Sequence, residues 1–130
     1  MFVDDFGNLI NPMLAEGQVH GGVAQGLGQA LTEHVVYDEN GQLLTATFMD
    51  YGMPRADLIP MIGFETEPVP STANPMGMKG CGEAGTVGAL AAVSNAMQDA
   101  LWEKGVKQVD MSFTPMRVWS LLQGAPLAAE

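Results

Sequence analysis

The sequence predicts an α+β fold in which three helices, at about residues 18–34, 84–103 and 115–123, pack on a small mixed or antiparallel sheet. Two observations predict this class. Apolar residues recur at three- and four-residue intervals in the helical segments, and short runs that alternate apolar and polar residues lie between them, bounded by turn-forming residues. With 130 residues, 47% of them hydrophobic, the chain is expected to form a single domain spanning residues 1–130.

The first helix is expected to have two distinct faces. One is an apolar stripe made of Val19, Val23, Leu27, Ala30 and Leu31. The other combines amides with glycine and consists of Gln18, Gly22, Gln25 and Gln29. Each glycine inside a helix costs about 1 kcal/mol relative to alanine, so several in one helix indicate a close approach by another group. A second helix, the commoner case, or a bound ligand would provide it, and the sequence leaves both open.

The predicted sheet is built from short segments. Residues 2–10 contain two apolar pieces around an Asp/Gly turn, and residues 35–48 are typical of a hairpin closed by Asn40–Gly41. A further strand is expected at residues 61–69, where nearby prolines confine it to an edge, and another at residues 109–113. A chain that begins inside a hairpin agrees with a truncation, so we expect either a fragment of a longer polypeptide or a short gene product that assembles with another chain.

The second and third helices have clear boundary signals. The apolar stripe of the second helix consists of Val87, Leu90, Val93, Met97 and Leu101. Lys104–Gly105 is expected to end it, because a cation and a glycine are typical of helix C-termini. Thr114 followed by Pro115 predicts the cap and the first turn of the third helix.

Composition excludes several classes of function. Fifteen acidic residues against five basic ones give a formal charge of −10, and the dispersed basic residues form no patch for nucleic acid or anionic membranes. No apolar run approaches the roughly 20 residues that span a bilayer. The single cysteine, Cys81, favours a reducing compartment, so we expect a cytoplasmic protein. His20 and His34 are isolated and lack the spacing of a metal site, so no metal ligand is assigned.

A glycine-rich turn at residues 79–85, with the sequence KGCGEAG, is the strongest candidate for a functional site. It places the carboxylate of Glu83 where little steric bulk surrounds the backbone, at the start of a long helix. Two other interpretations exist. A glutamate in the first turn of a helix is favoured by the helix dipole. The spacing also fits G-x-G-x-x-G, but the proline-rich residues 70–78 stand where a dinucleotide-binding fold needs a buried strand.

Two blocks of sequence together resemble a known family. Residues 11–28, NPMLAEGQVHGGVAQGLG, and residues 79–85 resemble the C-terminal part of the molybdenum-binding large subunit of molybdenum hydroxylases. Aerobic carbon monoxide dehydrogenase and bacterial aldehyde or xanthine dehydrogenases are the nearest in appearance. Residues 48–51 and 101–122 are similar as well, so the resemblance covers nearly the whole chain.

The resemblance implies roles for particular residues. Glu83 would be the catalytic general base, taking a proton from the hydroxyl that attacks the substrate carbon. Gln18 and Gly82 would contact the cofactor, a molybdenum-molybdopterin cytosine dinucleotide, and no residue here would ligate the metal. Family members have a much longer molybdenum subunit, so the cofactor would be shared with absent upstream segments and not bound by this chain alone.

The implied partners are the rest of the molybdenum subunit, iron–sulfur and flavin subunits or domains, and a small-molecule substrate. The sequence leaves two other hypotheses open. One is a non-catalytic structural or assembly module that binds a partner subunit, for which an exposed apolar surface would be the sign. The other, a small nucleotide-binding domain, depends on the glycine loop alone and requires a parallel sheet ending at residue 79.

Overall fold

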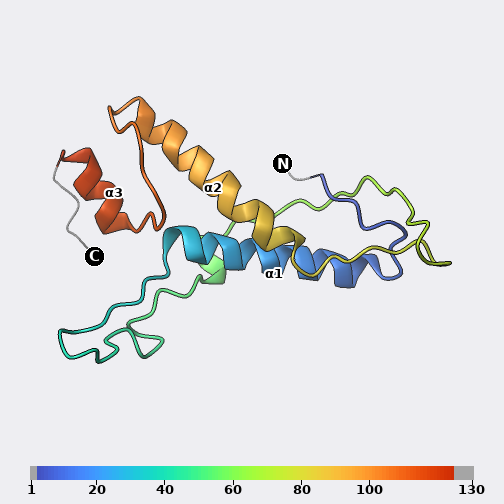
Figure 1. Cartoon of the computed structure of the whole chain (residues 1–130), viewed down its shortest axis with the longest axis horizontal. Coiled ribbons are helices and arrows are strands. Elements are labelled where there is room, and N and C mark those ends of the chain that lie inside the picture. The colour runs from blue at the N-terminus through green and yellow to red at the C-terminus, as the bar shows by residue number, and fades with distance from the viewer. Residues whose placement is uncertain (1–2, 125–130) are drawn as a thin grey trace.

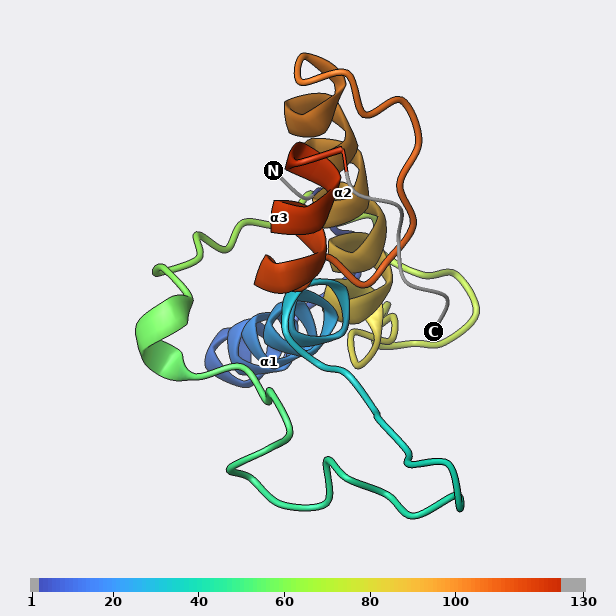
Figure 2. The same ribbon diagram turned by 90° about the vertical axis from the view of Figure 1, so that its left-hand side faces the viewer.

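Three α-helices and one short 3₁₀ helix make up the helical structure of the part of the chain that the structure describes. The computed structural model describes residues 3–124. The helices are α1 (Pro12–Leu31), η1 (Ala56–Leu58), α2 (Ala84–Trp102) and α3 (Pro115–Leu122). The start of α2 lies against the middle of α1, and the segment between α1 and η1 extends away from the helices in both views (Figure 1 and Figure 2).

Helix α1 begins six residues earlier than predicted, because its Asn-Pro pair starts the helix and does not interrupt it. The side chain of Asn11 accepts a hydrogen bond from the backbone N–H of Leu14 at 3.1 Å, and Pro12 occupies the first turn. Asparagine is a strong N-cap residue, and proline is tolerated in the first turn because the N–H it lacks has no helical partner there. The helix then ends at Leu31, three residues before the predicted boundary.

Glycines allow α1 and α2 to cross in direct backbone contact. A Cβ added to Gly85 would lie 2.5 Å from the carbonyl oxygen of Val19, and one added to Gly26 would lie 2.6 Å from the Cβ of Ala89. The hydroxyl of Thr86 donates a hydrogen bond to the carbonyl oxygen of Gly22 at 3.0 Å across this crossing. Helix packing therefore accounts for the close approach at Gly22 and Gly26, whereas the third buried glycine of α1, Gly28, lies against Glu33 and Pro54.

The core surrounds this crossing. Its buried members are Phe6, Val19, Val23 and Ala89. The ring of Phe6 stacks on Phe64 with centroids 6.4 Å apart and planes inclined by 12°. Phe6 precedes α1 in the sequence and Phe64 follows it, so segments from before and after α1 meet at the helix crossing.

The prediction of an α+β fold with helices on a sheet is wrong. Residues 3–124 contain no strand; they contain only isolated bridges, at Asp4 with Thr66, Gly7 with Met78, and Tyr37 with Leu43. Each bridge is a single pair and does not extend into a ladder. Phe2, the first residue of the predicted N-terminal hairpin, lies outside the described residues.

Side chains and helix ends take the hydrogen bonds that strand partners would have taken. In the predicted hairpin, the hydroxyl of Thr45 accepts from the N–H of Val36 at 3.1 Å. In the predicted strand at residues 109–113, the N–H of Val109 donates to the side-chain oxygen of Gln98 at 3.0 Å. Pro60, Pro68 and Pro70 have no N–H to donate, which limits pairing around residues 61–69.

A large share of the apolar surface remains exposed. The chain has an accessible area of 9209 Å², roughly 2,600 Å² more than the ~6,600 Å² expected of a compact monomer of this mass. The fully or largely exposed apolar side chains include Phe48, Met49, Met61 and Met116. Within residues 3–124, no helix is long and apolar enough to cross a bilayer.

Candidate functional site

The carboxylate of Glu83 is presented at the start of α2 without a structural partner. Glu83 is the N-cap residue of α2, yet its side chain makes no capping hydrogen bond. It is exposed, and within residues 3–124 its carboxylate takes part in no hydrogen bond or ion pair. The side chain of Glu83 therefore does not cap α2, while its charge lies near the positive end of the helix dipole, as the alternative interpretation of this residue expects.

The turn that carries Glu83 is sterically open on one side. A Cβ added to Gly80 or Gly82 would meet no atom within 4 Å. Cys81 between them is half-buried and packs against the core. A ligand could therefore approach the backbone of this turn closely, while the cysteine side chain anchors its inner side.

Both ends of the turn are fixed. On the N-terminal side, the N–H of Lys79 donates to the carbonyl oxygen of Phe6 at 3.0 Å, and its ammonium group pairs with the carboxylate of Asp5. On the C-terminal side, Gly85 is in backbone contact with α1 at Val19. Glu83 therefore projects from a short segment held between two firm attachments.

Gln18 lies next to this region, but Gly22 of the same predicted helix face does not share its exposed surface. Gln18 directly precedes Val19, whose carbonyl oxygen contacts Gly85, so Gln18 and Glu83 flank the same helix contact. Gln18 is exposed, and its amide has no hydrogen-bond partner within the described part of the chain. Gly22, in contrast, is buried under α2, so the expected continuous face of amides and glycine does not exist.

A hydrogen-bonded carboxylate that the sequence analysis did not single out supports the site. Asp5 accepts hydrogen bonds from the backbone N–H groups of Gly7 and Val69, both at 2.9 Å. The hydrogen bond from Lys79, followed by those from Val69 and Gly7, lowers the pKa of Asp5 from 3.8 to about 2. The Asp-x-Gly spacing at residues 5–7 could have indicated this hydrogen bond, because aspartate often accepts from the N–H two residues further along in such turns.

The histidines contribute no metal site in this region. The Nε2 atom of His20 is buried without a hydrogen-bond partner and lies 3.9 Å from a carboxylate oxygen of Glu16, too far for a hydrogen bond. Among residues 3–124, no group of three His, Cys, Asp or Glu side chains is arranged to hold a metal ion.

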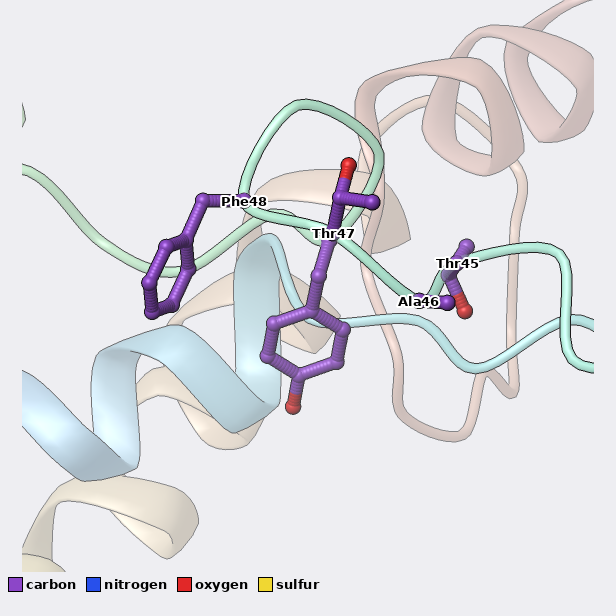
Figure 3. Close-up of a pocket in the computed structure, with 5 residues that line it drawn as sticks. Thr45, Ala46, Thr47 and Phe48 are labelled. Carbon is purple, nitrogen blue, oxygen red and sulfur yellow. The ribbon is translucent and has the colours of Figure 1, made fainter.

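A separate cavity of about 360 Å³ lies on the loop after α1 (Figure 3). It is lined by Thr45, Ala46, Thr47, Phe48 and Tyr51. The hydroxyl of Tyr51 donates to the carboxylate of Glu33 at 2.9 Å, and this hydrogen bond, with desolvation and the negative charge, raises the pKa of Tyr51. The cavity contains none of the residues predicted for the site, and its hydroxyls and apolar groups offer no charged group for catalysis.

Comparison with known proteins identifies the class. Residues 1–60 match the family model of a molybdopterin cofactor-binding domain. The chain is 41% identical over 122 residues to the nicotine 6-hydroxylase large subunit of Paenarthrobacter nicotinovorans, covering 94% of this chain and 15% of that protein. It is 39% identical to the carbon monoxide dehydrogenase large chain of Hydrogenophaga pseudoflava, covering 97% of this chain and 16% of that protein.

Solved structures agree with this class. The crystal structure of quinoline 2-oxidoreductase from Pseudomonas putida 86 superposes with a TM-score of 0.88 at 44% identity, over 95% of this chain and 16% of that one. These comparisons support a molybdopterin-binding segment of the kind found in the large subunits of these enzymes. The chain is similar to a molybdopterin-binding segment of molybdenum hydroxylases, which confirms the resemblance inferred from the two sequence blocks. It spans about 15% of the length of the relatives it matches.

Proposed function

We propose that this chain is the C-terminal segment of the large subunit of a molybdenum hydroxylase of the carbon monoxide, aldehyde or xanthine dehydrogenase type, and that Glu83 is its general base. The observation that carries the proposal is the state of this carboxylate. It is exposed on a glycine turn, and it makes neither the capping hydrogen bond nor an ion pair that would explain it structurally. A general base needs such freedom, because it must reach the proton it removes within hydrogen-bond distance.

The residues present fit the proposed cofactor, a molybdenum-molybdopterin cytosine dinucleotide. Gln18 offers an amide donor and acceptor that no group of the described chain uses, and Gly82 leaves its backbone accessible because a Cβ there would meet nothing within 4 Å. These two residues would hold part of the cofactor. When bound, the cofactor would supply the redox centre, and the role of Glu83 would be to accept a proton at its carboxylate beside it.

We further propose that the chain is inactive alone and works with the rest of a molybdenum subunit, and with iron–sulfur and flavin subunits or domains. Its excess accessible area of roughly 2,600 Å² is of the size that obligate interfaces bury. Glu83 is open to water here, whereas a general base that takes a proton from the attacking hydroxyl is expected to lie in a poorly hydrated pocket. The remaining polypeptide would provide that cover, and the substrate would be a small molecule.

A second candidate function is a structural or assembly module without chemistry. The observation that favours it is the exposure of large apolar side chains such as Phe48, Met49 and Met61, which a partner subunit could cover. The two candidates differ in what Glu83 does, because only the first requires its carboxylate for turnover. The nucleotide-binding alternative lacks its required parallel sheet, since residues 3–124 contain no strand.

The test compares two glutamates of one helix. Glu83→Gln changes the N-terminal end of α2, and Glu103→Gln, at the C-cap of the same helix, is the matched control. Each variant is coexpressed with an upstream molybdenum-subunit polypeptide, and molybdenum content, pterin content and turnover are measured on a panel of carbon monoxide, aldehydes and purines. We expect Glu83→Gln to lower turnover by about 10²- to 10⁴-fold at unchanged molybdenum content.

Each other outcome has a distinct meaning. If Glu83→Gln keeps full turnover, the proposed base is wrong. If the unsubstituted assembly incorporates the cofactor but turns over no substrate on the panel, the assembly module is favoured. Equal losses in Glu83→Gln and Glu103→Gln would indicate a general effect of charge on α2 and would also count against the proposed role.

A further inference from the structure

Asp5 connects three segments of the chain through one carboxylate. One of its oxygens accepts hydrogen bonds from the N–H groups of Gly7 and Val69, and the other pairs with the ammonium group of Lys79. Since Lys79 is 74 positions from Asp5 in the sequence, this pair is a tertiary contact. It lies at the last residue before the open part of the Glu83 turn.

Backbone hydrogen bonds strengthen the same connection up to Lys79. The N–H of Lys79 donates to the carbonyl oxygen of Phe6, and the N–H of Asn8 donates to that of Gly77, both at 3.0 Å. The side chain of Asn8 also donates to the carbonyl oxygen of Met76 at 3.0 Å. Residues 5–8 therefore form a strap across residues 76–79.

The hydrogen bonds stop immediately after Lys79. In the described chain, no group of residues 80–82 takes part in a hydrogen bond, and the next one involves the carbonyl oxygen of Glu83, which accepts from Val87 at 3.1 Å. Within residues 3–124, the other restraints on this span are the packing of Cys81 and the helix contact at Gly85. The direction in which Glu83 leaves the turn thus depends on where the chain is fixed at Lys79.

We propose that Asp5 and Lys79 are positioning residues that fix the entry of the glycine turn and thereby the place of the Glu83 carboxylate. Neither side chain touches the proposed base; the pair acts through the backbone of residues 80–82. The inference rests on the proposed function of Glu83 for its catalytic meaning. Its structural content, the restraint of residues 80–83 by the pair, is measurable without any cofactor.

The experiment uses backbone ¹⁵N relaxation of the 130-residue chain to measure the order parameters of the amides at residues 80–83. Asp5→Asn keeps an oxygen that can accept from Gly7 and Val69 but removes the charge. Lys79→Met removes the ammonium group, and Lys79→Arg keeps a cation. Exposed charges of the same type, at Lys104 and Asp110, provide the matched controls Lys104→Met and Asp110→Asn.

We expect order parameters near ~0.85 in the unsubstituted chain to fall below ~0.6 in Asp5→Asn and in Lys79→Met. The double variant should show no further decrease, because each single change already breaks the pair. Lys79→Arg should retain most of the order, and amides in the middle of α2 should be unchanged throughout. In the coexpressed assembly, the same two variants should lower kcat by about 10-fold at unchanged molybdenum content, with Lys79→Arg restoring it.

The proposal is overturned if residues 80–83 keep their order in both single variants, if the effects of the two single variants add, or if the controls produce the same loss. A variant that loses its helical circular dichroism would show that the pair maintains the fold and not the turn, which also counts against it. These outcomes do not depend on whether Glu83 is the general base. If Glu83→Gln retains turnover while the order parameters fall as expected, the proposed function fails and the positioning of the turn stands.

Discussion

Replacing Gly85 with alanine tests whether the backbone contact between α1 and α2 organises this fold. The added Cβ would lie 2.5 Å from the carbonyl oxygen of Val19, 2.8 Å from the N–H nitrogen of Val23 and 3.1 Å from the carbonyl carbon of Gly22. All three are backbone atoms of α1, so no side chain can rotate away and the helices must separate. Overpacking of this kind costs about 1–3 kcal/mol, with the upper end expected for backbone neighbours.

Alanine also gains helix propensity over glycine, by about 1 kcal/mol. The net effect expected for Gly85→Ala is therefore a loss of about 2 kcal/mol in the free energy of unfolding. For a chain of this size, each kcal/mol shifts the thermal midpoint by roughly 3–5 °C, so the midpoint should fall by roughly 6–10 °C. Urea unfolding followed by circular dichroism and by tryptophan fluorescence measures the change directly.

Gly21→Ala is the matched control, because Gly21 is an exposed residue of α1 at which a Cβ would meet nothing within 4 Å. It should gain about 0.5–1 kcal/mol from helix propensity alone. The reasoning would be refuted if Gly85→Ala were as stable as the unsubstituted chain, or if the two substitutions shifted the urea midpoint in the same direction by similar amounts.

Two further predictions concern the start of α1 and the Asp5 carboxylate. Asn11→Ala removes the cap that accepts from Leu14 and should cost about 0.5–2 kcal/mol of unfolding free energy, with Asn11→Ser retaining most of it; equal midpoints for the two variants would contradict the capping role. Because hydrogen bonds from Lys79, Val69 and Gly7 lower the pKa of Asp5 to about 2 in the folded chain, its contribution to stability is complete above the unfolded pKa of about 3.9 and is lost as the pH falls through about 2. Urea midpoints measured between pH 5 and pH 2 should therefore fall less steeply in Asp5→Asn than in the unsubstituted chain, and parallel curves would exclude this linkage.

The helices could be predicted from the sequence because their signals are local. Apolar spacing located α2 to within about a residue, and Thr114 followed by Pro115 marked the start of α3, where the threonine hydroxyl does accept from the N–H of Arg117. The start of α1 was missed because Asn11–Pro12 was interpreted as a break, although the same pair is a good cap and first turn. The glycines of α1 correctly indicated a close backbone approach, but only the structure distinguishes Gly22 and Gly26, which contact α2, from Gly21, which does not.

The sheet could not be excluded from the sequence, because alternation shows that a segment suits an extended conformation and not that it finds a partner. Tyr37 and Leu43 do form a bridge across the predicted turn. Pairing stops there because the N–H of Val36 bonds to the hydroxyl of Thr45 and not to a strand backbone. Whether two distant segments pair as strands depends on which side chains and helix ends compete for each backbone N–H. A local sequence pattern does not reveal that competition.

Two of the segments that form no sheet, around residues 35–49 and 61–69, expose apolar side chains, whereas Phe6 and Phe113 in the other two segments are buried. Met49 and Met61 are 92% and 95% exposed, whereas Val19 and Ala89 at the helix crossing are 4% and 2% exposed. The contacts that fix the Glu83 turn, from Asp5 on one side and α1 on the other, are thus all internal to this chain. This chain does not exclude water from that turn, because the side chains of Glu83 and Gln18 are exposed. Under the proposed function, this chain sets where the base lies, while the exclusion of water that catalysis needs must come from the polypeptide that covers it.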